Sequence, residues 1–210
     1  MTFAEFYDLM LEDIDYNIFL DTFHKYLKTT CKIVDLGCGT GSFLTVLLDN
    51  NYNAFGIDND KEMLDLAYKK LSRKDVLFYH DINEEIDIKA DVFFMLFDVI
   101  NFNSDYKNIF KNIYQALNNN GILIFDFYKN NIARKYKNYA ESDENYKWQI
   151  ETKANVMIHN LEFYNNKKTV TQYIHNKKDI IKTLKALNFK YKFIKGPDKR
   201  KHYLVCFKVK

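Results

Sequence analysis

The stretch Val34-Asp35-Leu36-Gly37-Cys38-Gly39-Thr40-Gly41 decides how this chain folds. An apolar run, Ile33–Leu36, leads into it, and a helix-period segment, Gly41–Leu48, follows. Glycines allow a tight turn and a close approach of the backbone to a ligand, and the N-terminus of a helix offers free N–H groups. The stretch therefore predicts a strand, a ligand-binding glycine loop and a helix. NAD-binding folds use a similar loop, so the glycines alone leave the ligand open.

Apolar runs and helix-period segments alternate along the chain after residue 30, a pattern typical of a parallel sheet covered by helices. The expected strands are 33–36, 54–58, 76–79, 91–97 and 122–125. The expected helices are 41–48, a segment that opens with the capping pair Asn59 and Glu62, and 105–117, which ends where Asn118–Gly121 favour a left-handed cap. These elements predict an α/β fold.

The pattern changes after Asp126. Residues 129–145 are polar and irregular, and the following segments 146–151, 156–163 and 169–175 alternate with period two, which predicts a small antiparallel insertion. Asn176 then caps a helix, and strands at 191–194 and 202–209 form a final hairpin in which Lys199–Lys201 are expected to be solvated. The chain thus divides into an N-terminal helical lid (1–30), a main domain (31–128 and 177–210), and a linker with the insertion (129–176) on the acceptor side.

Three acidic residues, Asp35, Asp58 and Asp81, each close one of three successive expected strands. In open α/β sheets, ligands bind at the edge formed by the carboxyl ends of the strands. A carboxylate at Asp58 can accept hydrogen bonds from both hydroxyls of an adenosine ribose, and Asp81 or the adjacent backbone can meet an adenine amino group. Such an acidic edge favours a cationic ligand with free ribose hydroxyls over a pyrophosphate.

The run Val34–Gly41 resembles motif I of class I S-adenosylmethionine-dependent methyltransferases, with Asp58 and Asp81 as the acids after strands two and three. The resemblance implies a Rossmann-like methyltransferase fold, in which a seven-stranded, mostly parallel sheet of order 3-2-1-4-5-7-6 carries helices on both faces. It also implies that the first acid and the glycine loop surround the methionine moiety. The second acid would hold the ribose and the third region the adenine.

Further segments are similar to a narrower group, the small-molecule N-methyltransferases, which includes sugar-amine N,N-dimethyltransferases and glycine/sarcosine-type enzymes. The similar segments are Gly56–Asp60 with Glu62–Leu64, Leu96–Phe102, and Ala116-Leu117 with Gly121–Asp126, and the pairs Tyr7-Asp8 and Asp15-Tyr16 resemble the N-terminal aromatic lid of that group. Two positions depart from this group, because Phe19 stands where it often has Trp and Asn59 replaces a common Ser. The linker and the insertion are also short, so the acceptor is less well defined than the cofactor.

The resemblance and the strand ends together assign candidate site residues. The expected cofactor-binding residues are Tyr16, Asp35, Gly37, Cys38, Gly39, Gly41, Asp58, Asn59, Met63, Asp81, Ile82, Leu96 and Phe97. The expected acceptor-side residues are Tyr7, Asp98, Asn101, Trp148, Tyr173 and His175, the last two on one face of a strand. An amine acceptor needs only to arrive deprotonated, whereas an oxygen acceptor would want a base such as His175 or Asp98. The expected cofactor is S-adenosylmethionine, with S-adenosylhomocysteine as its product and no metal.

Composition excludes several other classes of protein. The 31 Lys and Arg residues oppose 28 Asp and Glu, and Arg73, Arg134 and Arg200 are isolated, so nucleic acid is not an expected partner. Three cysteines without CxxC spacing indicate neither a disulfide framework nor a zinc site. The start of the chain lacks a cationic signal region, and the most apolar run, 92–97, is too short to span a membrane. These features favour a cytoplasmic location and leave monomer and homodimer open.

The sequence leaves three functions open. We expect methyl transfer to a small-molecule acceptor, and the family resemblance favours an amine. A methyltransferase for protein or RNA is less favoured, because Phe97-Asp98-Val99-Ile100 stands where many such enzymes carry an Asn/Asp-Pro-Pro-aromatic motif. A non-catalytic S-adenosylmethionine-binding protein uses the same fold, since a fold does not fix a function.

Overall fold

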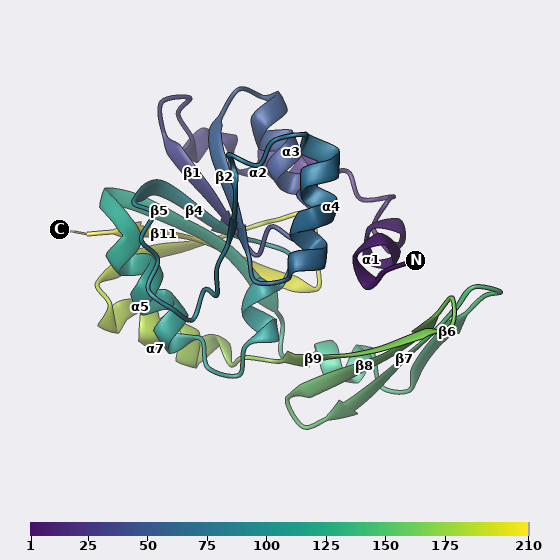
Figure 1. Cartoon of the computed structure of the whole chain (residues 1–210). Helices are drawn as coiled ribbons and strands as arrows, with labels where there is room; N and C mark the ends of the chain where they lie inside the picture. The colour runs from purple at the N-terminus through teal and green to yellow at the C-terminus, as the bar shows by residue number, and fades with distance from the viewer. Residues whose placement is uncertain (210) are drawn as a thin grey trace.

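The computed structural model describes residues 1–209, which form a twisted seven-stranded sheet, helices on both of its faces, and a separate four-stranded sheet (Figure 1). Residue 210, the last of the predicted segment 177–210, lies outside the described residues. The large sheet contains β1 (Lys32–Leu36), β2 (Asn53–Asp58), β3 (Leu77–Tyr79), β4 (Ala90–Met95), β5 (Leu117–Tyr128), β10 (Phe189–Ile194) and β11 (Lys201–Lys208). Its order, β10-β11-β5-β4-β1-β2-β3, confirms the predicted Rossmann-like methyltransferase topology.

Strands β1 to β5 run parallel, and β11 returns antiparallel to β5 and β10. Helices α2 (Asn17–Phe23), α3 (Ser42–Asp49) and α4 (Lys61–Leu71) cover one face of the sheet, and α5 (Lys107–Ala116) and α7 (Lys177–Ala186) cover the other (Figure 1). Short 3-10 turns follow α2 (His24–Tyr26) and β4 (η2, Val99–Phe102). Among residues 1–209, no helix is long and apolar enough to cross a membrane.

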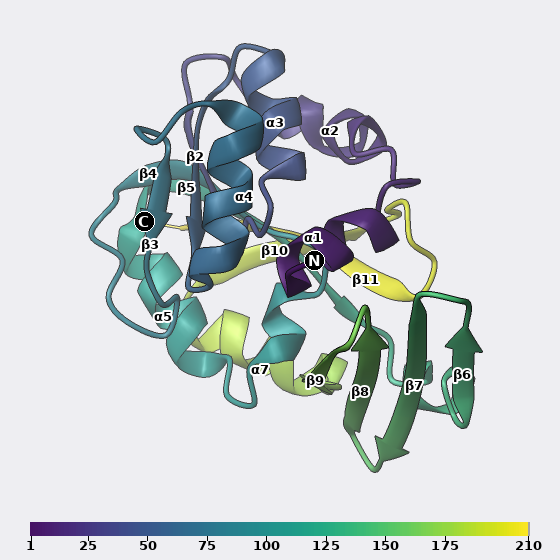
Figure 2. The ribbon, with the colours of Figure 1, turned by 45° about the vertical axis from the view of Figure 1, so that its right-hand side comes forward.

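The insertion is a sheet of four antiparallel strands, β6 (Tyr139–Ser142), β7 (Tyr146–Lys153), β8 (Val156–Phe163) and β9 (Asn166–Tyr173). It stands beside the large sheet (Figure 2). The prediction that residues 129–145 are irregular is wrong, because they contain the short helix α6 (Ile132–Lys135) and strand β6. Strand β6 is a mostly exposed edge strand, so it lacks the alternating apolar pattern that identifies half-buried strands.

The N-terminal helix α1 (Phe3–Met10) joins the two sheets. A capping box between Thr2 and Glu5 starts the helix, and Phe6 stacks on Phe163 of the insertion at 4.4 Å between ring centroids. On its other side Asp8 accepts a hydrogen bond from Thr40 in the glycine loop at 2.6 Å. Figure 2 shows α1 between α4 and the insertion sheet. The predicted lid segment 1–30 therefore contributes one helix to this position, whereas α2 packs on the large sheet.

Two predicted helix boundaries were wrong. Asp60, not Asn59, caps α4, because the side chain of Asp60 accepts the N–H groups of Glu62 and Met63. Helix α5 ends at Ala116 without a left-handed cap, and Asn118–Gly121 instead form an irregular part of β5 at which its register with β4 shifts. Asn120 carries the positive φ angle, 62°, within that segment.

Two of the three glycines in the glycine loop, Gly37 and Gly39, have different surroundings. Gly37 has φ +69° and packs so closely on the 3-10 turn η2 that an added Cβ would lie 2.5 Å from a methyl carbon of Val99. Gly39 has φ +53° and has no atom within 4 Å of such a Cβ. Gly37 is therefore required for packing within the protein, and Gly39 faces open space.

We predict that Gly37→Ala lowers the free energy of unfolding by about 1–3 kcal/mol more than Gly39→Ala does. Both variants place a side chain at positive φ, but only Gly37→Ala also overlaps Val99. Urea unfolding without cofactor measures the difference. Adding Val99→Ala to Gly37→Ala should restore part of the loss, and equal losses for the two single variants would contradict the packing argument.

Candidate functional site

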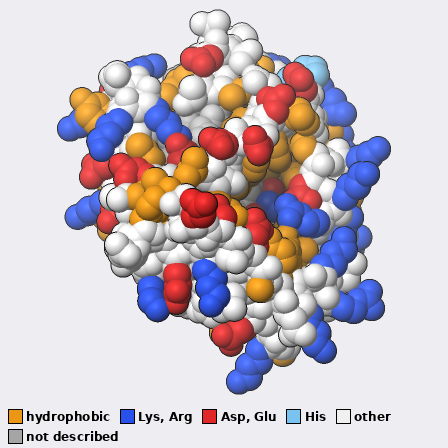
Figure 3. Space-filling view, turned by 90° about the vertical axis from the view of Figure 1, so that its right-hand side faces the viewer, with side chains coloured by type: hydrophobic (Ala, Val, Ile, Leu, Met, Phe, Trp, Pro, Cys, Tyr) orange, Lys and Arg blue, Asp and Glu red, His pale blue; other side chains and the backbone are white. Residues whose placement is uncertain are grey.

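The candidate site lies at the carboxyl ends of the parallel strands, where α1 and the insertion sheet stand over the edge of the large sheet (Figure 2). Seen from this side, the surface is hollowed, and acidic, basic and hydrophobic side chains meet in the hollow (Figure 3). This is the edge at which the sequence predicted ligand binding, since open α/β sheets bind ligands there.

The glycine loop is fixed by hydrogen bonds from β2. The N–H groups of Gly37 and Cys38 both donate to the carbonyl of Ile57, at 2.7 and 3.0 Å. One oxygen of Asp58 accepts the N–H of Gly39 at 2.8 Å, and the other accepts the N–H of Asp60 at 2.8 Å. Gly41 is the N-cap residue of α3 and has a left-handed backbone conformation. The carboxylate of Asp58 thus holds the loop while it lies at the edge where a ribose would bind.

Asp35 is the most deeply buried acid of this loop, with 3% of its surface exposed. Burial, together with the charge of Asp58, raises the pKa of Asp35 to about 8. A cation beside Asp35 would favour its ionised form and lower that pKa again. The open space at Gly39 and these two acids therefore fit the cationic methionine end of S-adenosylmethionine.

The predicted adenine region lies beyond β3. Asp81 accepts hydrogen bonds from the backbone N–H and the side-chain amide of Asn83, at 2.9 and 2.8 Å. These bonds, with a contact from Asn59, hold the pKa of Asp81 below its ordinary value. Met63 and Ile82 are both 8% exposed. This arrangement gives one charged and two apolar side chains, as the family resemblance implies for an adenine site.

Cys38 lies inside the loop but turns its side chain into the protein. Its Sγ occupies the space beside Gly56, where an added Cβ would lie 2.7 Å away. Burial raises the pKa of the Cys38 thiol well above its ordinary value, and the charges of Asp35 and Asp58 raise it further. The thiol is therefore kept in its unreactive protonated form, and the loop presents only the backbone of Cys38.

Strand β4 ends in a turn of two consecutive residues with positive φ angles, Phe97 at 61° and Asp98 at 57°. Such angles are uncommon for residues other than glycine and require stabilisation by their surroundings. The carboxylate of Asp126 in β5 provides it, because it accepts the N–H of Phe97 at 2.9 Å and the N–H of Asp98 at 2.6 Å. Leu96, just before the turn, is buried in the core.

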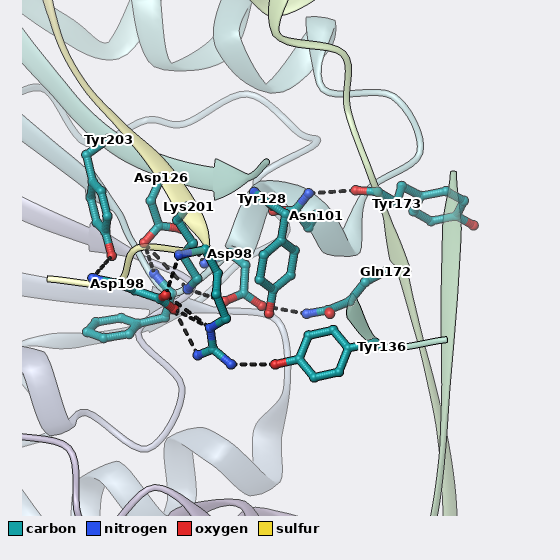
Figure 4. Close-up of polar contacts among 12 residues, drawn as sticks. Asp98, Asn101, Asp126, Tyr128, Tyr136, Gln172, Tyr173, Asp198, Lys201 and Tyr203 are labelled. Atoms are coloured by element: carbon teal, nitrogen blue, oxygen red, sulfur yellow. Dashed lines mark hydrogen bonds and ion pairs between the residues drawn. The ribbon is translucent and has the colours of Figure 1, made fainter. Parts of the chain in front are cut away.

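Lys201, the first residue of β11, lies between Asp98 of the turn and Asp126 of β5 (Figure 4). Its Nζ donates to Asp98 and lies 3.7 Å from an oxygen of Asp126. Burial lowers the pKa of Lys201, but Asp126 and Asp98 raise it more, so the net shift is upward. Burial raises the pKa of Asp126 to about 6 despite the opposing effect of Lys201. Fully ionised, the cluster has two carboxylates and one ammonium.

Aromatic side chains surround this cluster. Burial raises the pKa of Tyr7, and the charges of Asp98 and Tyr16 raise it further. The ring of Tyr16 lies 5.2 Å from that of Phe97, and the ring of Tyr128 lies 5.4 Å from Nζ of Lys201. The structure thus brings together the predicted residues Tyr7, Tyr16, Phe97 and Asp98.

Two other predicted acceptor-side residues, Asn101 and Tyr173, serve internal contacts. Asn101 is fully buried, donates to the backbone carbonyl of Tyr173 at 2.6 Å, and accepts the N–H of Tyr128 at 3.2 Å. The side chain of Tyr173 lines a separate surface pocket with Asn83 and Phe102. Neither side chain is a candidate for acceptor binding in this structure.

The prediction that Tyr173 and His175 share a strand face is wrong, because β9 ends at Tyr173. His175 packs its ring on Tyr106 and hydrogen-bonds the carbonyl of Ile100 at 3.1 Å. Burial lowers the pKa of His175, and its buried position between η2 and α5 removes it as a candidate base. Trp148 faces His159 within the insertion sheet.

Comparison with known proteins identifies the fold and the family. The family described as "Methyltransferase domain" matches residues 33–121. A carboxy-S-adenosyl-L-methionine synthase of Campylobacter lari is 31% identical over 179 residues, which cover 78% of this chain and 76% of that protein. The chain belongs to the class I S-adenosylmethionine-dependent methyltransferases. A Bacillus subtilis protein named as a methyltransferase, YqeM, is 29% identical over 176 residues, 77% of this chain and 71% of that protein.

Solved structures of methyltransferases share the fold over the whole chain. An S-adenosylmethionine-dependent methyltransferase of Clostridium acetobutylicum superposes with a TM-score of 0.83 at 22% identity, covering 99% of this chain and 98% of that one. The sugar N-methyltransferase KedS8 of a Streptoalloteichus species superposes with a TM-score of 0.77 at 14% identity, covering 100% and 94%. This methyltransferase therefore carries the N-terminal helices and the insertion in the same overall arrangement as those proteins.

Sequence reasoning missed three polar residues of this methyltransferase's site: Asp126, Gln172 and Lys201. Asp126 closes the expected fifth strand just as Asp35 and Asp58 close theirs, so the same rule could have identified it as a site residue. Lys201 was predicted to be solvated in the hairpin and is 8% exposed, because the antiparallel pairing of β11 with β5 places it beside Asp126. The nearby Arg200 is half-exposed and bonds Asp198 and Tyr136.

The raised pKa of Asp35 predicts a pH-dependent cost to folding. Between about pH 4 and 8, the unfolded chain releases the proton of Asp35 while the folded chain keeps it, so stability falls as pH rises across this interval. Asp35→Asn removes this dependence. Its free energy of unfolding, measured by urea without cofactor, should exceed that of the unmodified protein by an amount that grows from pH 5 to 8. A difference constant with pH would contradict the burial of an acid here.

Proposed function

We propose that this methyltransferase transfers the methyl group of S-adenosylmethionine to the nitrogen of a small-molecule amine. The observation that carries the proposal is the Asp98 carboxylate, which lies in a buried cluster with Asp126 and a single ammonium, that of Lys201. This cluster has an excess of one negative charge when ionised. A neutral amine can donate an N–H to Asp98 without adding charge. When its lone pair forms the new N–C bond and the S–C bond of the cofactor breaks, the positive charge passes from sulfur to this nitrogen. The cluster would stabilise that charge, whereas an anionic acceptor would increase the excess of negative charge.

On the cofactor side, we assign residues of the site to the ribose, the methionine end and the adenine of S-adenosylmethionine. Asp58 would accept the ribose hydroxyls, the loop around Gly39 would hold the methionine end beside Asp35, and Asp81 with Ile82 would border the adenine. Bound S-adenosylmethionine supplies an activated methyl group, so the protein needs mainly to align the acceptor nitrogen and to exclude water. Helix α1, which Asp8 holds to Thr40, would cover the site and limit the access of water.

The acceptor side would use the hollow between the β4 turn and the insertion sheet. Asp98 would accept an N–H of the amine and orient its lone pair, while Tyr7, Tyr16 and Phe97 provide apolar walls. Support comes also from KedS8, whose name describes a sugar N-methyltransferase. The Campylobacter lari relative is named for a different product, carboxy-S-adenosylmethionine, and the assay below separates the two reactions.

Calorimetry with S-adenosylhomocysteine tests the cofactor side. We expect binding to the unmodified protein and a weakening of about tenfold or more for Asp58→Ala, because the variant loses a charged hydrogen-bond acceptor. Asp65→Asn, on the exposed side of α4, serves as the control and should bind as the unmodified protein does. Binding by Asp58→Ala equal to that of the control would contradict the assigned ribose contact.

A product assay tests the acceptor side. The protein is incubated with S-adenosylmethionine and a panel of amines, amino sugars, amino acids, hydroxylated compounds, RNA and protein extract, and the products are identified by mass spectrometry. We expect a methylated amine, and a loss of about tenfold or more in kcat/KM for Asp98→Asn relative to Asp65→Asn. Methylation confined to oxygen, RNA or protein, or a carboxylated cofactor in place of a methylated acceptor, would overturn the proposal.

A further inference from the structure

Three polar side chains lie on the inner face of the insertion sheet, one on each of three adjacent strands: Trp148 on β7, His159 on β8 and Gln172 on β9. Side chains alternate between the two faces of a strand, and the register pairs Ile150 with His159 and Met157 with Gln172. The three residues therefore share the face that also carries Ile150 and Met157, both buried against the linker and Tyr128.

Hydrogen bonds connect this face to the turn at the end of β4. The indole Nε1–H of Trp148 donates to Nδ1 of His159 at 3.2 Å, and the two rings stack at 5.8 Å between centroids. At the other end, the side-chain amide of Gln172 donates to one oxygen of Asp98 (Figure 4). His159 is 8% and Gln172 5% exposed, so water does not compete freely for these contacts.

The chemistry of the indole, imidazole and amide groups determines which atom donates and which accepts in each hydrogen bond. Indole nitrogen only donates, so Nδ1 of His159 accepts, and a neutral ring must carry its proton on Nε2. Nε2 of His159 and Oε1 of Gln172 are buried, and neither has a hydrogen-bond partner within residues 1–209. They are a matched donor and acceptor on adjacent strands, and the side chain of Gln172 acts to raise the pKa of His159. With Oε1 turned to His159, the amide N–H₂ of Gln172 must face Asp98.

We propose that Trp148, His159 and Gln172 form a chain of positioning residues that orients the Asp98 carboxylate toward the acceptor. Gln172 holds one oxygen of Asp98 and Lys201 holds the other, so the carboxylate cannot rotate. Its remaining lone pairs face the hollow and accept from an N–H donor. The inference rests on the proposed function for the identity of the acceptor, an amine with at least one N–H, but the chain itself can be tested without any acceptor.

Protonation of His159 should break the chain. The imidazolium form donates from both nitrogens, so its Nδ1–H would face the Nε1–H of Trp148. The groups that face His159 are Trp148 from β7, Gln172 from β9 and the charge of Asp98 from the large domain. Burial lowers the pKa of His159 from its ordinary value of 6.5, while Gln172 and Asp98 act in the opposite direction. At neutral pH the ring is therefore neutral and the chain is intact.

The single tryptophan of the sequence gives a direct probe, because Trp148 stacks on the ring that titrates. We expect the emission of Trp148 to change in a transition below pH 6.5 that is absent in His159→Gln. Asp98→Asn and Gln172→Met should shift the transition to lower pH, because each variant removes a group that raises the pKa of His159. Circular dichroism and S-adenosylhomocysteine binding confirm that each variant is folded. A midpoint unchanged in both variants would overturn the connection between His159 and Asp98.

Kinetics with an amine found in the panel tests the effect on the reaction. We expect Gln172→Met to lower kcat/KM by about tenfold to a hundredfold, since it removes a hydrogen bond to a charged group, and to leave the affinity for S-adenosylhomocysteine unchanged. Gln149→Met makes the same change on the opposite, exposed face of the insertion sheet and should have no effect.

His159→Gln offers the conservative rescue, because its amide can still donate to Oε1 of Gln172. We expect it to retain more activity than His159→Leu and to lose the dependence of Trp148 emission on pH. Equal kinetics for Gln172→Met and Gln149→Met would overturn the positioning role. If no amine in the panel is methylated, the proposed function fails, and the emission transition still decides whether the chain exists.

Discussion

The carboxylate of Asp126 holds together the part of the molecule on which the site depends. It accepts the N–H groups of two consecutive residues, Phe97 and Asp98, whose positive φ angles would otherwise cost energy. Two successive N–H groups that converge on one anion form a favourable binding geometry in proteins. The resulting turn places Asp98 in contact with Gln172 and Lys201 and brings Val99 against Gly37, so the same turn supports the glycine loop and the Asp98 cluster.

The energetic cost of burying charged groups in this region is offset by ion pairing rather than by hydration. Lys201 lies between Asp98 and Asp126, and the three groups reduce one another's cost of transfer into the protein. Within residues 1–209 no ion pair joins Asp35 to a cation, and the raised pKa of Asp35 shows the remaining cost of its burial. A cationic cofactor beside Asp35 would supply the missing charge. The unliganded protein is thus less stable at neutral pH than its packing alone would allow, a common property of binding sites.

Local patterns in the sequence determined the main architecture. The alternation of apolar runs and helix-period segments was enough to predict a parallel sheet covered by helices, because strand and helix periodicity are properties of neighbouring residues. The strand order and the family came from the resemblance of the glycine loop and later motifs to class I methyltransferases. The acids that end successive strands followed from the same rule, since the carboxyl ends of parallel strands share one edge. The exposed strand β6 was missed because its residues carry no apolar alternation.

Only the tertiary structure decided which side chains meet across the hollow. Lys201 is far from Asp98 in sequence, and their contact depends on the antiparallel return of β11 beside β5. Gln172 reaches Asp98 because the insertion sheet turns that face inward, and its neighbour Tyr173 therefore lies on the opposite face. His175 lies beyond the end of β9 and packs against η2 and Tyr106. The sequence by itself determined the fold and the cofactor edge. The acceptor side required the three-dimensional packing, because it is assembled from segments far apart in the sequence, whose relative placement no local pattern records.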